Sequence, residues 1–421
     1  MPGPLRAALV LALIVGASGL ACGGEEDGGG DTPIERTPAP ANPAYAPPAD
    51  RIDPAVAATS TFAALAALGE ARSGPDANAA PPATTLSRYV SAQAGDDAQD
   101  GSEANPWRTL QHAADTVDPD TTVYVEAGDY EGGIVITRGG DTDRWVVFTA
   151  RDTSNPPRLL GGMDRDAVVA IDASWVTIHG LEIASHDRGD LRSDEIGINV
   201  EPESADISHI RLLDNHIHHI GPPDTGGKSC SYNAHGLIAQ SKGYRIANLI
   251  IDGNELHDLY VGNSECLVVN GLVEQFQVTR NYVHDVNNIA IDIIGYEKSS
   301  RETTRFGLVA DNVVLDASNY WPYCTRGNCT YPEGDESSDG IYVDGGAGLE
   351  IAYNVVGRTD HGIELQSENG ELIRDVEVHH NLVFNSNYEQ LTIGASENVT
   401  ERDNVLVDEP TLANTTLEGC K

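Results

Sequence analysis

The chain has 421 residues, of which 6% are aromatic, and it contains 43 glycines. Its 26 Lys and Arg against 65 Asp and Glu give a formal net charge of -39. A charge of this sign repels nucleic acid and anionic lipid and attracts divalent cations, so we expect no nucleic-acid partner.

Residues 1–22 are expected to be an export signal, with Arg6 before an apolar run that is too short to span a membrane. The run ends in Gly19-Leu20-Ala21-Cys22, which resembles a lipoprotein signal-peptidase box, although Leu20 lies two residues before Cys22 instead of three. We expect a lipid on Cys22 to anchor the protein at the outer membrane or the cell surface. A plain signal peptide and a secreted protein are the alternative.

Residues 23–87 are rich in Gly, Pro, Ala and acids, which predicts a disordered linker. The folded domain is expected over 88–415. It opens with a strand and a Gly/Asp turn, and a short amphipathic helix should follow Pro106. Leu110, Ala113, Ala114 and Val117 have the spacing of one helical face.

From about Trp175 onward, seven segments share a hydrophobic strand, an Asn and another hydrophobic step. The spacings between these asparagines are 39, 27, 31, 42, 27 and 23 residues, near the length of one solenoid coil or of a coil with an insertion. Asn tolerates a left-handed turn and can bond to the Asn of the next coil. We therefore predict a parallel β-solenoid in which Gly180 occupies the first ladder position. The asparagines are Asn215, Asn254, Asn281, Asn312, Asn354, Asn381 and Asn404.

The opening YVS…GDD…DGS…NPWRTLQHAAD…VYVEAGDY resembles that of extracellular bacterial right-handed parallel β-helix proteins of the pectate-lyase-like superfold, including some polysaccharide lyases. The run from Asp339 to Gly370 resembles a segment common in secreted bacterial β-helix proteins. The resemblance implies an all-β, right-handed parallel β-helix whose helix caps the open end. It also implies a polysaccharide as partner. We expect a monomer.

A second strand follows each Asn strand, as in AIDII, GIYVD and GIELQ, with its third and fifth residues directed outward. Stacking these strands brings six polar residues onto three consecutive coils. They are Asp292, Asp339, Tyr342, Asp344, His361 and Glu364.

We expect a polysaccharide lyase acting on acidic, uronate-containing polysaccharide with Ca²⁺. The candidate catalytic residues are Asp292, Glu364, His361 and Lys298. Asp292, Asp339 and Asp344 are the candidate Ca²⁺ ligands. The candidate substrate-binding residues are Trp321, Tyr323, Tyr342 and Arg358, the first two from a long aromatic insertion at 318–339.

Two alternatives remain open at this stage. A glycoside hydrolase could use Asp292 and Glu364, whose separation by two coils fits inverting hydrolysis. In a non-catalytic glycan-binding or structural protein, these acids would only keep the outer face of the strands hydrated. His218, His257 and His284 also recur at one position in three coils, each followed by His or Asp. They could act as general bases, but we favour a turn-stabilising ladder.

Overall fold

The computed structural model describes residues 80–161, 167–185, 195–221, 233–297, 303–318 and 338–407. Cys22, the linker up to residue 79, Lys298, Trp321 and Tyr323 lie outside the described residues. The first strand begins at Leu86, so Leu86 and Ser87 belong to the folded domain and not to the predicted linker. Among the described residues, no helix is long and apolar enough to cross a membrane.

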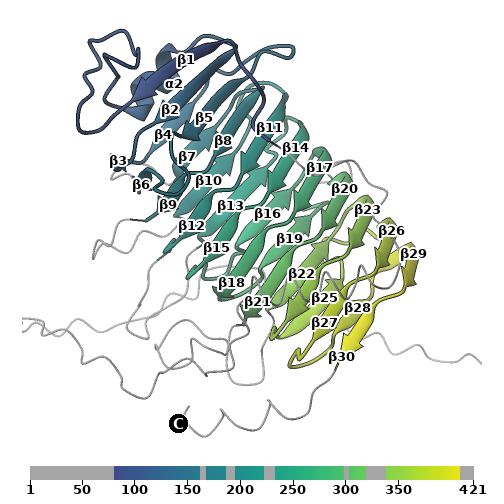
Figure 1. Cartoon of the computed structure of the whole chain (residues 1–421). Helices are drawn as coiled ribbons and strands as arrows, with labels where there is room; N and C mark the ends of the chain where they lie inside the picture. Colours follow the sequence, from purple (N-terminus) through teal and green to yellow (C-terminus); the bar gives the residue numbers. More distant parts are fainter. Residues whose placement is uncertain are drawn as a thin grey trace, which may run out of the picture. The chain divides into compact units, whose positions relative to one another are not determined.

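Three parallel sheets wind around one axis, and each coil contributes one strand to each sheet (Figure 1). The first sheet has 11 strands, in the order β1 (Leu86–Val90), β2 (Thr121–Val125), β5 (Val146–Ala150), β8 (Val176–His179), β11 (Ile207–Leu213), β14 (Ile246–Asp252), β17 (Val273–Thr279), β20 (Arg305–Ala310), β23 (Ala347–Ala352), β26 (Ile373–His379) and β29 (Ser396–Arg402).

The second sheet has 10 strands: β3 (Asp129–Glu131), β6 (Arg158–Leu160), β9 (Glu182–Ala184), β12 (His216–His218), β15 (Glu255–His257), β18 (Tyr282–Val286), β21 (Val313–Ala317), β24 (Val355–Gly357), β27 (Leu382–Phe384) and β30 (Val405–Val407). The third sheet has nine: β4 (Ile134–Ile136), β7 (Ala167–Ile171), β10 (Ile196–Val200), β13 (His235–Gln240), β16 (Leu267–Asn270), β19 (Ile291–Ile294), β22 (Asp339–Asp344), β25 (His361–Leu365) and β28 (Leu391–Ile393).

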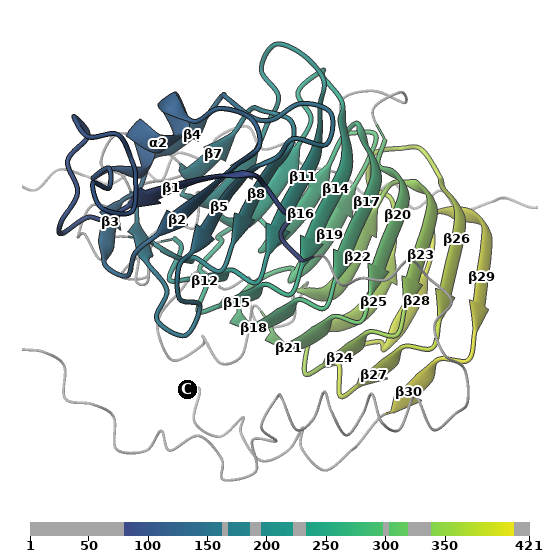
Figure 2. The ribbon, with the colours of Figure 1, turned by 45° about the horizontal axis from the view of Figure 1, so that its top comes forward.

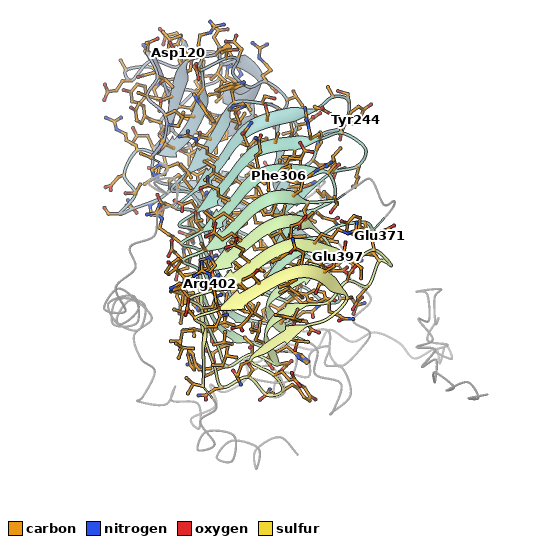
Figure 3. All side chains as sticks on the ribbon, turned by 90° about the vertical axis from the view of Figure 1, so that its right-hand side faces the viewer. Asp120, Tyr244, Phe306, Glu371, Glu397 and Arg402 are labelled. Carbon is orange, nitrogen blue, oxygen red and sulfur yellow. The ribbon has the colours of Figure 1, made fainter. Side chains whose placement is uncertain are left out.

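The chain therefore forms a right-handed parallel β-helix, as the sequence predicts, and its strands stack coil upon coil (Figure 2). Alternate residues of each strand point into the core. In β19, Ile291 and Ile293 are fully buried and belong to one hydrophobic core that runs from Val90 to Val383. Burying each such side chain contributes about 1.5–3 kcal/mol. Figure 3 shows the outer face of the first sheet, on which Phe306 of β20 is labelled. Phe306 is 63% exposed.

The predicted asparagine ladder is confirmed. From Asn215 to Asn381, each side-chain Nδ2 donates to Oδ1 of the asparagine in the next coil, at 2.9–3.0 Å. The same Oδ1 also accepts the backbone N–H of the preceding asparagine, at 3.0 Å. Because Asn254, Asn281, Asn312 and Asn354 are at most 1% exposed, these bonds satisfy polar groups that water does not reach.

The left-handed residue is not the asparagine but the residue before it, contrary to the sequence-based expectation. Asp214, Arg280 and Tyr353 have φ of 49°, 55° and 59°. The first coil follows the same rule, because Gly180 has φ of 66° and the next residue, Leu181, donates its backbone N–H to Asn215 Oδ1. Leu181, and not Gly180, therefore occupies the ladder position.

The predicted helix is α2, Leu110–Thr116, and its buried face is formed by Leu110, Ala113 and Ala114. It begins after Thr109, whose hydroxyl accepts the His112 N–H at 3.2 Å. Gln111 then pairs with the backbone of Val135 in β4, donating to its carbonyl at 3.0 Å and accepting its N–H at 2.8 Å. The helix thus satisfies the edge strand of the third sheet, which would otherwise be free to pair with another chain.

Candidate functional site

The third sheet carries the predicted outward column. Strand register pairs Val268 with Asp292, Asp292 with Tyr342, and Tyr342 with Glu364. The prediction that these residues stack is confirmed. Their environment differs from a solvated face, however, because Val268, Asp292 and Tyr342 are 0%, 2% and 7% exposed. Their strands β16, β19, β22 and β25 lie side by side in Figure 1.

We call Glu265, Asp292, Asp339, Asp344 and Glu364 the carboxylate cluster. Asp292 is its most deeply buried acid, and its Oδ1 has no hydrogen-bond partner among the described residues. Burial raises the pKa of the Asp292 carboxyl well above its ordinary range, and the charges of Glu265 and Asp344 raise it further.

Asp339, His361 and Glu364 form the tightest part of the cluster. Asp339 pairs with His361 across β22 and β25, and one ligand atom of each of the three residues lies within 4.8 Å of the others. His361 Nδ1 is 3.7 Å from Glu364 Oε2, and the His361 ring stacks on Tyr388 at 5.0 Å. Burial, followed by the Glu364 charge, raises the pKa of the Asp339 carboxyl well above its ordinary range. Asp339 is thus a buried carboxyl with a raised pKa beside the more exposed carboxyl of Glu364.

The segment that follows β25 forms hydrogen bonds with Asp344 and Tyr342. Asp344 accepts the backbone N–H of Glu368 at 2.6 Å and the Asn369 amide at 2.8 Å. The Tyr342 hydroxyl donates to the Gln366 carbonyl at 2.6 Å. Burial raises the pKa of Asp344 to about 7, although the hydrogen bond from Glu368 opposes this shift. Tyr342, predicted to bind substrate, is therefore mostly buried and hydrogen-bonded to the protein itself.

Glu265 was missed by sequence reasoning. The register of β13 and β16 places it beside His235, at the pre-strand position that Asp339 and His361 occupy in later coils. The repeat position alone could therefore have identified Glu265 as a site residue. Burial raises the pKa of Glu265 to about 8, with further contributions from nearby acids such as Glu297.

The predicted Ca²⁺ ligands are only partly brought together. Asp292 and Asp344 lie outside the group formed by Asp339, His361 and Glu364, the one ligand group on this face that the described residues contain. Asp344 already accepts two hydrogen bonds, whereas Oδ1 of Asp292 and Oδ1 of Asp339 are buried without a described partner. Asp292 and Asp339 thus offer oxygens of the type Ca²⁺ prefers, but they do not make a complete ligand set.

Arg358 does not join the carboxylate cluster. It follows β24 and forms two hydrogen bonds with the Asp316 carboxylate of β21, at 2.7 and 2.5 Å. The Asp316 side chain is 6% exposed, so the pair is anchored at the second sheet. The role of Arg358 in substrate binding stays a prediction. Lys298, Trp321 and Tyr323 lie outside the described residues, and their roles remain predictions.

Cys266 at the start of the third-sheet segment is a free, fully buried cysteine whose thiol is 3.6 Å from the Asn287 carbonyl. Burial raises the pKa of this thiol well above its ordinary value. The residue packs in the core as a small apolar side chain and adds no nucleophile to the site.

Comparison with known proteins finds one curated relative to report. The chain is 33% identical over 317 residues to the uncharacterized protein YwoF of Bacillus subtilis (strain 168). The match covers 73% of this chain and 64% of the relative, so the chain spans less than two thirds of that protein's length. No family model matches the chain.

Several solved structures resemble the chain at low sequence identity. A GH136 lacto-N-biosidase from Eubacterium ramulus is 14% identical with a TM-score of 0.49, over 76% of this chain and 67% of that one. A rhamnogalacturonan lyase is 9% identical with a TM-score of 0.47, over 79% and 88%. Pectate lyase Pel9A is 13% identical with a TM-score of 0.43, over 79% and 80%.

Proposed function

We propose that the protein is a carbohydrate-active enzyme that cleaves glycosidic bonds at the carboxylate cluster. The observation that carries the proposal is the group of Asp339, His361 and Glu364, whose ligand atoms lie within 4.8 Å of one another. The substrate class rests on the resemblance of the chain's opening to β-helix proteins that include polysaccharide lyases. That part of the proposal is an analogy at the level of the fold, whereas the chemistry comes from the residues.

Two carboxyl groups with different protonation states are what glycoside hydrolysis requires. Asp339 would be the general acid, because burial and the Glu364 charge raise the pKa of its carboxyl. Glu364, 18% exposed, would be the second carboxyl group. One oxygen of Asp339 and one of Glu364 lie within 4.8 Å of each other, which is nearer to the separation that retaining hydrolysis uses than to the longer one of inverting hydrolysis. We therefore propose this pair in place of the more distant Asp292 and Glu364 pair that the coil spacing suggested.

A second candidate is β-elimination on an acidic polysaccharide. It is favoured by the unpartnered oxygens of Asp292 and Asp339. A bound Ca²⁺ would neutralise a uronate carboxylate, and these two carboxyl groups would give up their protons to supply two of its oxygen ligands. His361, whose buried Nδ1 has no hydrogen-bond partner among the described residues, would be the proton acceptor.

The test is a screen of purified protein against neutral and uronate-containing polysaccharides, with Ca²⁺ or with a chelator. Hydrolysis releases reducing ends alone, whereas elimination also creates an ultraviolet-absorbing double bond. Asp339→Asn and Glu364→Gln should each lower turnover by about 10²–10⁴-fold. The control Glu350→Gln, on β23 of the first sheet, should leave turnover unchanged. If no polysaccharide is cleaved, the protein is a glycan-binding or structural β-helix instead.

A further inference from the structure

A second group of titratable residues lies on the outer face of the second sheet. Register pairs His216 of β12 with Glu182 of β9 and Glu255 of β15, and pairs His218 with His257. We call Glu182, His216, His218, Glu255 and His257 the histidine cluster. The strands that carry it, β9, β12 and β15, are adjacent in Figure 1.

The ring nitrogens of this cluster face one another. His216 Nε2 is 2.5 Å from His257 Nε2, and a Glu255 oxygen joins them to form a group of ligand atoms within 4.8 Å of one another. A second such group consists of Glu182, His216 and His218. Since both groups use the single His216 side chain, the cluster offers a site for one ion and not two.

Neighbouring residues hold two of the ligand groups, His257 and Glu255, in place. The Asp258 carboxylate lies 2.8 Å from His257 Nδ1, which leaves His257 Nε2 to accept a metal. His284 Nε2 lies 3.2 Å from a Glu255 oxygen, and its other nitrogen is 2.8 Å from Asp285. Carboxylate–histidine pairs of this kind commonly surround protein metal sites and fix their ligands.

His216 Nε2 and His257 Nε2 share a hydrogen bond in this structure, and a bound ion would take the place of its proton.

We propose that the histidine cluster binds one divalent transition-metal ion of the Zn²⁺ class through Nε2 of His216, Nε2 of His257 and the Glu255 carboxylate. Imidazole and carboxylate ligands suit Zn²⁺, Co²⁺ and Ni²⁺, whereas Ca²⁺ takes oxygen ligands. The ion joins β12 to β15 and so links two successive coils. This site is separate from the carboxylate cluster, which lies on the third sheet.

The experiment uses the full chain without a polyhistidine tag, stripped with a chelator and titrated with Zn²⁺ in a calorimeter and with Co²⁺ in a spectrophotometer. The wild type should bind one equivalent, and its melting temperature should rise with Zn²⁺ by mass action. His216→Gln and His257→Gln should each lower the affinity at least about tenfold. His112→Gln, in α2 far from the cluster, is the matched control and should bind as the wild type does.

His361→Gln separates the two candidate sites. If this variant loses Zn²⁺ while His216→Gln retains it, the ion sits in the carboxylate cluster and the proposal is wrong. The proposal is also overturned if the stripped wild type binds no equivalent of Zn²⁺. Should a cluster variant fail to fold, X-ray absorption of the Zn²⁺-loaded wild type still decides. Two imidazole nitrogens in the Zn²⁺ coordination shell would support the proposed site, and one or none would refute it.

Discussion

Asp292 is a carboxyl group that the fold buries among other carboxyl groups. At 2% exposure and with Oδ1 unpartnered, its ionised form would be strongly unfavourable in the folded chain. The unfolded chain imposes no such constraint. Asp292 therefore links folding stability to pH in the direction opposite to that of a salt-bridged acid, and it does so together with Asp344 and Glu265.

The first prediction concerns this linkage. Folded-state pKa values of about 7 for Asp344 and about 8 for Glu265 exceed their ordinary values of 3.8 and 4.5. Between those limits the folded chain binds more protons than the unfolded chain. The free energy of unfolding should thus fall as pH rises from about 4 to 8, by up to about 1.4 kcal/mol per pH unit for each group. Urea unfolding at several pH values measures this slope.

Asp292→Asn tests the contribution of one residue. The variant should match the wild type near pH 4 and become more stable than it as pH rises, because a neutral amide needs no proton. Asp118→Asn changes an acid whose side chain is 75% exposed and should leave the slope intact. A wild-type stability that rises between pH 5 and 8 would contradict the buried-acid account.

At the scale of elements, the asparagine side chains of the ladder make the hydrogen bonds that join one coil to the next at this turn. Asn281 is an example. Its Nδ2 donates to Asn312 Oδ1 and to the Ile251 carbonyl, and its Oδ1 accepts two N–H groups from Asn254. One side chain thus satisfies polar groups in three coils.

The second prediction follows from these bonds. Asn281→Ala should destabilise the fold by about 3 kcal/mol, because each buried group left unpaired costs about 1–3 kcal/mol. Asn404→Ala, at the last and more exposed ladder position, should cost clearly less. Chemical unfolding of both variants measures the difference. Equal losses would mean that burial along the ladder does not determine its strength.

The third prediction concerns the cap. Gln111→Ala removes the two bonds to the Val135 backbone and so frees the edge of β4. We expect a loss of about 1–2 kcal/mol and concentration-dependent self-association in light scattering. Asp115→Ala removes only an exposed partner of the Gln111 amide, so this variant should not self-associate. A dispersed Gln111→Ala variant would show that the bulk of α2 alone protects the edge.

At the scale of the whole molecule, the sequence repeat predicted more of the fold than of the candidate site. The repeat was sufficient for the sheets and for the stacking of Asp292, Tyr342 and Glu364, since a coil repeats one local geometry, although it placed the first ladder position one residue too early, at Gly180. Partners that come from turns could not be predicted in the same way. Arg358 follows the second sheet, and its pairing with Asp316 depends on the left-handed turn at each residue. His216 was missed because only the position two residues later recurs as histidine.

The fourth prediction concerns where the protein is held, and it rests on the sequence alone. We propose that Cys22 carries a lipid and that residues 23–79 tether the β-helix to the membrane surface. Cys22→Ser should then move the protein from the membrane fraction to the soluble fraction, measured by fractionation and immunoblotting. The matched control Ala21→Gly keeps the cysteine and should stay with membranes. Unchanged fractionation of Cys22→Ser would show that the box is not used.

The unequal spacing of the ladder also has a mechanical consequence. A chain pulled from its C-terminal end in an optical trap should unravel coil by coil, because each ladder bond joins only neighbouring coils. The ladder steps from Asn354 to Asn381 and from Asn312 to Asn354 release 27 and 42 residues. At full extension these lengths correspond to roughly 90 Å and roughly 140 Å. The released length would therefore identify each coil except the two with 27-residue steps, which their order in the force trace would distinguish.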